Sequence, residues 1–199
     1  MGSTQYYVAQ SLDGYIAERD GGLEWLLSYG ASEGGVSEGG GSESGSSDSG
    51  VSAATDGAYD RFYAQIGALA MGSATYEWIL AHVEGWPYAE LPAWVFSSRG
   101  LPAAGGGADV RFVSGPVGPA HAEMVGAAGE RNVWLVGGGD LASQFAEAGL
   151  LDELLVTIVP VVLGDGLPTF ARRLGQRLRR TGAQPYGNGM TELRYALVR

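Results

Sequence analysis

The stretch from Asn132 to Phe145 constrains the fold of this chain more than any other. It begins with the apolar run Val133–Val136, which is typical of a buried strand, and it continues through three glycines at 137–139. Leu141 and Phe145 then follow at the spacing of one face of a helix. The stretch therefore predicts a strand, a tight turn and a helix.

The glycine triplet at 137–139 is suited to a phosphate. Glycine lets the backbone approach a ligand without a Cβ in the way, and the free N–H groups at a helix start bind anions. The chain has 34 glycines, and the other two triplets, 39–41 and 105–107, have polar or Ala-rich surroundings and no preceding strand. We interpret 137–139 as a nucleotide-phosphate turn, with a purely structural turn as the alternative.

Length and composition indicate one globular domain over residues 1–199. The chain is 45% hydrophobic and 17% charged, which is enough for one substantial core. The longest apolar run, 154–163, is interrupted by Pro160 and is about half of what a bilayer requires. The N-terminus also lacks the charged and apolar regions of a signal peptide, so we expect a cytoplasmic protein without membrane contact.

Charge and residue types exclude several functions. The chain has no cysteine, which excludes disulfides and thiolate chemistry, and its only histidines are His82 and His121, so we expect no metal site. The formal net charge of −10 argues against a nucleic-acid partner. A phosphorylated cofactor would have to find local donors.

Strands and helices alternate along the rest of the chain. We predict strands at 4–9, 68–71, 93–96, 110–113, 132–136 and 154–159, helices at 55–66, 73–82, 119–128 and 141–148, one helical turn at 23–27, and a hairpin at 178–184 and 190–198. This order predicts an α/β fold of three layers, α/β/α, with a mixed, mainly parallel sheet and an antiparallel C-terminal hairpin. Residues 32–52, rich in Gly, Ser and acid, are interpreted as a flexible surface insertion.

The predicted strand ends point to one ligand site. The turns at Gly72, Ser97 and Gly137 all follow strands, and ligands in such sheets bind beyond the carboxyl ends of the strands. The string from Gly137 to Ala142 also matches a Rossmann fingerprint. However, the next strand ends at 159–160 without the acid that would hold the ribose, which disfavours a Rossmann enzyme.

Five segments in this order resemble the dihydrofolate reductase superfamily, and more closely its RibD C-terminal branch, the reductase domain of riboflavin biosynthesis. They are Val8–Ala17, Met71–Glu77, Val95–Arg99, Val136–Leu141 and Val159–Gly166. The resemblance covers nearly the whole chain outside the insertion. It implies a dihydrofolate reductase-like fold and an NADPH-dependent reductase.

The resemblance also implies the cofactor-binding residues. The nicotinamide would lie between Ala9 and Ile16, with 11–17 as a partial lid, and NADPH rather than NADH would be favoured by the adenosine side. The residues expected to bind the rest of the cofactor are Gly72, Ser73, Thr75, Ser97, Ser98, Arg99, Val136, Gly137, Gly138, Gly139, Asp140 and Leu141. The family commonly has a cis Gly-Gly bond in the glycine turn. Ser73 departs from the pattern, because relatives usually carry arginine there.

The expected reaction is hydride transfer from the nicotinamide to a pyrimidine or pterin-like substrate, which also needs a proton donor. Asp56 is the first candidate donor and Asp13 the second, although each also suits a structural role as a helix cap or a turn. Asp165 would line the substrate side. Trp25, Tyr76 and Trp86 suit either stacking on a heterocycle or core packing.

Three functions remain open at this point. The first is the RibD-type reductase of 5-amino-6-(5-phosphoribosylamino)uracil. The second is a dihydrofolate reductase-like enzyme acting on a pteridine or another small molecule. The third is a non-catalytic nucleotide-binding dimer. A homodimer is expected by analogy with the RibD branch.

Overall fold

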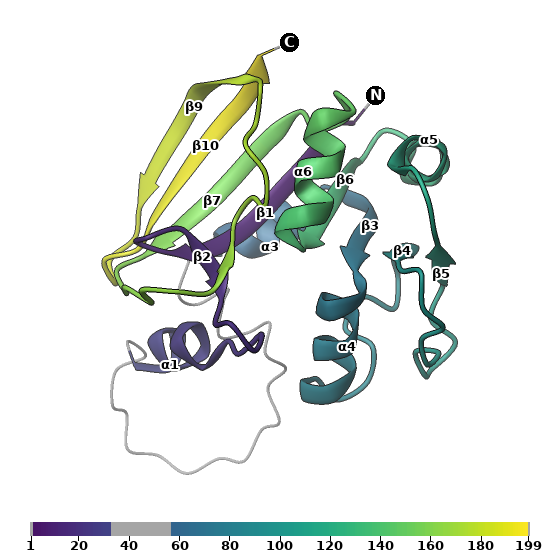
Figure 1. Cartoon of the computed structure of the whole chain (residues 1–199), viewed down its shortest axis with the longest axis horizontal. Coiled ribbons are helices and arrows are strands. Elements are labelled where there is room, and N and C mark those ends of the chain that lie inside the picture. Colours follow the sequence, from purple (N-terminus) through teal and green to yellow (C-terminus); the bar gives the residue numbers. More distant parts are fainter. Residues whose placement is uncertain (1, 33–56, 199) are drawn as a thin grey trace.

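One eight-stranded sheet runs through the whole molecule (Figure 1). The computed structural model describes residues 2–32 and 57–198. The strand order is β5-β4-β3-β6-β1-β7-β10-β9. The strands are β1 (Thr4–Ser11), β3 (Ile66–Gly72), β4 (Ala93–Phe96), β5 (Val110–Val113), β6 (Asn132–Gly137), β7 (Glu153–Val159), β9 (Arg177–Pro185) and β10 (Thr191–Val198). Neighbouring strands from β5 to β7 pair in parallel, whereas β10 is antiparallel to β7 and to β9. The predicted mainly parallel sheet with an antiparallel C-terminal hairpin is confirmed.

Helices cover both faces of the sheet because the buried strands are apolar on both sides. On one face α5 (Val117–Ala128) and α6 (Gly139–Glu147) pack against Tyr6 of β1, and on the other face α3 (Ala58–Tyr63) and α4 (Ser73–His82) form a cluster with Tyr7. Successive side chains of a strand point to opposite faces, which explains why neighbours in β1 belong to different clusters. This confirms three layers, α/β/α.

A third cluster joins α1 (Glu24–Ser32) to the end of the sheet. Trp25 packs with Val159 at the end of β7 and with Tyr186 and Met190 of the β9–β10 turn, and Ala9 packs against them. The sequence predicted only one helical turn here, at 23–27. The helix runs on to Ser32, the last described residue before the gap.

A two-stranded ribbon was not predicted. β2 (Tyr15–Ala17) pairs antiparallel with β8 (Leu167–Pro168), two segments about 150 residues apart in the chain. Each segment is too short to show a periodic pattern, so only the folded chain reveals the pairing. The ribbon connects the predicted lid at 11–17 to the segment that leads into β9.

The predicted helix at 55–66 was wrong at its end. The helix α3 ends at Tyr63, and Ile66 is the first residue of β3. Ile66 is fully buried in the same cluster as Phe62, so its apolar spacing reflects a shared core rather than a shared helix. Asp56 and residues 33–52 of the predicted insertion lie outside the described residues. None of the described helices is long and apolar enough to cross a membrane.

Candidate functional site

Four loops converge at one edge of the sheet. β4, β3, β6 and β1 are parallel neighbours, so the loops that follow them, at 97–99, 72–75, 137–141 and 11–17, leave the sheet at the same edge. In Figure 1, α4 extends from this edge and α6 lies over the sheet beside it. The predicted convergence of the turns at Gly72, Ser97 and Gly137 agrees with this topology.

The β3–α4 turn presents a helix start without a side-chain cap. Gly72 precedes the ten-residue helix α4, and its residue makes no capping hydrogen bond. The first N–H groups of a helix have no partner within the helix, so they are available to an anion. Thr75, in the first turn, reaches the neighbouring loop, because a Cβ on Gly137 would lie 2.8 Å from Thr75 Oγ1.

Arg99 supplies a cation beside Ser73. Arg99 Nη2 lies 3.3 Å from Ser73 Oγ and donates to Glu77 Oε2 over 2.8 Å. The Ser97 hydroxyl fixes the turn, since it accepts from Arg99 N–H at 2.9 Å and donates to the Arg99 carbonyl at 3.0 Å. Ser98 is exposed at the tip. The positive charge that relatives carry at position 73 is therefore present in space, on the next strand of the sheet.

Each glycine of the triplet has a distinct structural reason. Gly137 faces Thr75, Gly138 has φ +100°, which side-chain-bearing residues rarely adopt, and a Cβ on Gly139 would lie 2.2 Å from the Pro168 carbonyl oxygen. Gly138 precedes α6 and gives it no side-chain cap. The expected cis Gly-Gly bond was wrong, because no peptide bond in the described ranges is cis. The positive φ of Gly138 makes the turn with trans bonds.

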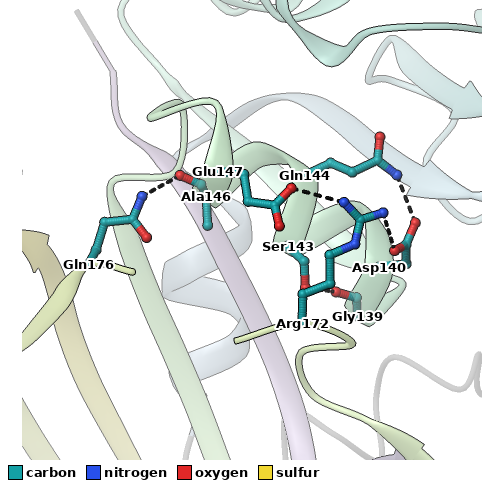
Figure 2. Close-up of polar contacts among 8 residues, drawn as sticks. All are labelled: Gly139, Asp140, Ser143, Gln144, Ala146, Glu147, Arg172 and Gln176. Carbon is teal, nitrogen blue, oxygen red and sulfur yellow. Dashed lines mark hydrogen bonds and ion pairs between the residues drawn. The ribbon is translucent and has the colours of Figure 1, made fainter. Parts of the chain in front are cut away.

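The side chain of Asp140 is held along the outside of α6. Arg172 Nη2 donates to Asp140 Oδ1 at 2.8 Å, Gln144 Nε2 donates to Asp140 Oδ2 at 2.7 Å, and Arg172 Nη1 reaches Glu147 Oε2 at 2.9 Å (Figure 2). Leu141 points into the core, with 5% of its surface exposed, and Val136 is half-buried. Asp140 and Leu141 can therefore contribute to a phosphate site through their backbone N–H groups.

The segment after β8 ties two of these loops together. Thr169 N–H and its hydroxyl both donate to the Gly14 carbonyl in the predicted lid, over 3.1 and 3.0 Å. Two residues later Ala171 N–H donates to the Gly139 carbonyl at the start of α6. We call residues 167–172 the strap. Its role was missed from the sequence, because nothing local in Leu167–Arg172 signals contacts so distant along the chain.

Asp13 acts as a fastener in the lid. Its carboxylate accepts from the Ser11 hydroxyl at 2.7 Å and from the N–H groups of Leu163 and Gly164 at 3.1 and 2.7 Å. The Ser11 hydrogen bond and these backbone N–H groups lower the pKa of Asp13. A carboxylate with a lowered pKa is ionised at neutral pH, which favours a structural role over proton donation. Asp165 forms an exposed ion pair with Arg19.

Other predicted residues have varied surroundings. Ala9 and Ile16 are half-buried, on β1 and β2. Trp25 and Tyr76 are buried in core clusters, and Trp86 packs against Tyr76, so core packing rather than an exposed stacking surface describes all three. His121, predicted on a solvated helix, is half-buried and its Nε2 lies 2.8 Å from Thr4 Oγ1.

A cavity of about 640 Å³ lies away from this edge. Its lining includes Ser3, Gln5 and Asn132 at the amino ends of β1 and β6, and Arg61 of α3. The predicted cofactor residues are at the carboxyl ends of the same strands. Its large volume therefore does not mark the converging loops as the site, and their chemistry does.

Comparisons with known proteins agree with this geometry. A family model described as the RibD C-terminal domain matches residues 122–191. The uncharacterised protein YwjB of Bacillus subtilis (strain 168) is 30% identical over 188 residues, 94% of each chain. A crystal structure from Shewanella sp. PV-4, named for riboflavin biosynthesis, is 26% identical over 99% of both chains, with a TM-score of 0.73. The dihydrofolate reductase of Enterococcus faecalis complexed with NADP(H) is 15% identical, covers 99% of this chain and 97% of its own, and has a TM-score of 0.60, so it shares the fold.

Proposed function

Because this chain belongs to the RibD C-terminal domain family of the dihydrofolate reductase superfamily, we propose that it is an NADPH-dependent reductase of a pyrimidine or pterin-like ring. The substrate we put first is 5-amino-6-(5-phosphoribosylamino)uracil. NADPH is a reductant of the cell interior, so the proposal includes a cytoplasmic location, and it includes a homodimer.

The observation that carries the proposal is the group formed by Arg99, Ser73 and two helix starts. The starts of α4 and α6 have no side-chain caps, and both leave the same edge of the sheet. Two such helix starts suit the two ends of a phosphorylated dinucleotide, and Arg99 suits its 2′-phosphate. Thr75 and Gly137 keep the two loops in contact.

The residues of the chain would have clear tasks. Bound NADPH would supply a hydride at the nicotinamide C4. Gly72, Ser73 and the N–H groups at 138–141 would bind phosphates, while Ala9 and Ile16 would confine the nicotinamide under the 11–17 lid. Asp56 stays our candidate for proton donation, and Asp13 is the second candidate.

Two measurements test this function. Titrating the protein into NADPH should change the nicotinamide fluorescence with a saturable response, and NADH should bind more weakly. Adding 5-amino-6-(5-phosphoribosylamino)uracil, or 7,8-dihydrofolate as a comparison, should then oxidise the cofactor at a rate proportional to protein. Binding of NADPH without oxidation by either compound would instead favour a non-catalytic nucleotide-binding protein. A light-scattering mass equal to one chain would reject the dimer.

A further inference from the structure

A buried carboxylate lies in line with Ala9 across three strands. Ala9 of β1 pairs with Thr157 of β7, and Thr157 pairs with Glu192 of β10. Paired residues of adjacent strands project to the same face of a sheet, with strands about 4.8 Å apart. Glu192 is 1% exposed. An acidic side chain is therefore buried on the face of the sheet that Ala9 shares, about two strand spacings away.

Glu192 organises the polar groups around it. The Tyr186 hydroxyl donates to Glu192 Oε2 at 3.1 Å, and Arg194 Nε donates to Oε1 at 2.5 Å. Burial, together with the charge of Glu192, raises the pKa of both Tyr186 and Tyr7. Both phenols therefore keep their protons and remain donors. Tyr186 packs in the same cluster as Ala9, so Glu192 fixes the orientation of a ring beside the predicted nicotinamide position.

Two buried polar atoms in this region have no hydrogen-bond partner. Thr157 is 4% exposed, and its hydroxyl makes no hydrogen bond to any described residue, although the Tyr7 phenol is nearby. Trp25 Nε1, in the cluster with Tyr186, also has no partner among the described residues. A buried polar group without a partner costs about 1–3 kcal/mol. Such groups beside a predicted reaction site indicate contacts that a ligand would complete.

Stability gives a poor explanation for this arrangement. Burying a carboxylate carries a large desolvation cost that its ion pair only partly offsets, and an apolar side chain of similar volume is often equally stable. Leucine at position 192 would fill the same space against Tyr7 and Tyr186. The charge and the free hydroxyl are better explained by recognition of a polar molecule.

We propose that Thr157 contacts the substrate ring and that Glu192 is a positioning residue, which holds Tyr186 and Arg194 so that a polar wall faces the ring beside Ala9. The inference rests on the proposed function, because Ala9 marks the nicotinamide position only if the chain binds NADPH. The charges of Glu192 and Arg194 cancel. The wall therefore suits an uncharged planar ring with N–H and carbonyl groups on one edge, and a phosphate or carboxylate of the substrate must lie elsewhere.

Ring binding to the NADP⁺-saturated protein tests the wall separately from turnover. The probes are pterin and 5,6-diaminouracil, which lack phosphate and carboxylate groups, and calorimetry measures their affinity. Glu192→Gln and Thr157→Val should each weaken ring binding at least about tenfold, since one interaction worth 1.4 kcal/mol is tenfold. Thr157→Ser keeps the hydroxyl and should restore binding. NADPH affinity should stay within about twofold in all variants.

Glu153→Gln is the matched control, because Glu153 is a carboxylate on the same face of β7, at the far end of the strand, where it accepts from Gln5. This variant should bind both rings like the native protein. Equal ring binding by the native protein and Thr157→Val, or no ring binding by a native protein that binds NADPH, would overturn the inference and leave the cofactor proposal standing. A native protein that fails to bind NADPH would reject the proposed function itself. If Glu192→Gln does not fold, the comparison of Thr157→Val with Thr157→Ser still decides.

Discussion

Replacing Arg99 by glutamine should weaken NADPH binding selectively. In the absence of cofactor, Arg99 is paired with Glu77, and the two side chains are 60% and 41% exposed. A hydrogen bond between a guanidinium and a phosphate contributes about 1.5–3 kcal/mol, whereas an exposed ion pair such as Arg99–Glu77 contributes about 0–1 kcal/mol. The difference, about 1–2 kcal/mol, corresponds to a roughly 5- to 30-fold loss of affinity for NADPH. NADH lacks the 2′-phosphate and should lose less than about twofold.

Fluorescence titration with both cofactors measures this difference. The NADPH preference of the native protein should also fall between low salt and about 0.5 M salt, because exposed charges are screened. Arg111→Gln is the control, since Arg111 is a surface arginine of the adjacent strand β5 that pairs with Asp109 and lies 4.5 Å over the Trp94 ring. Equal losses for NADPH and NADH in Arg99→Gln would show that Arg99 only supports the fold. An unchanged NADPH affinity would refute its role at the 2′-phosphate.

The remaining predictions concern stability. Gly139→Ala should lower the free energy of unfolding by about 1–3 kcal/mol or more, because its Cβ would lie 2.2 Å from the Pro168 carbonyl; Gly118→Ala, in open space on α5, should not, and equal melting temperatures would contradict this. Phe145→Ala should cost about 3–5 kcal/mol in urea unfolding, because its ring is fully buried between α6 and the sheet, and a loss below 1 kcal/mol would be inconsistent with that core. Asp13→Asn should lower the melting temperature at pH 7. Because the folded pKa of Asp13 is depressed, this difference should shrink as the pH falls below about 4, and a constant difference down to pH 3 would show that ionisation does not matter.

Local patterns predicted most of the sheet. The apolar runs of β4 and β5 and the hairpin of β9 and β10 have clear boundaries, and each strand lies close to its predicted range. The alternation of strands and helices then fixes the parallel order, because parallel strands need a crossover between them. The convergence of the loops at 72, 97 and 137 follows from that order alone.

Contacts between distant residues could not be predicted. Alternation in β10 places the core-facing residues Leu193 and Leu197 on one face and so predicts Glu192 on a solvated face. The cluster of Trp25 and Tyr186 covers that second face, which no local pattern shows. Likewise, the strap residue Thr169 bonds to Gly14, 155 positions earlier in the chain.

The strap restricts how this protein can vary in length. Six residues, 167–172, support both the lid, through Gly14, and the start of α6, through Gly139. Adding or deleting one residue there would displace both attachments at once, because the distance between them is set by the sheet. Loop grafting aimed at a new substrate should therefore exchange the lid and the strap as one unit.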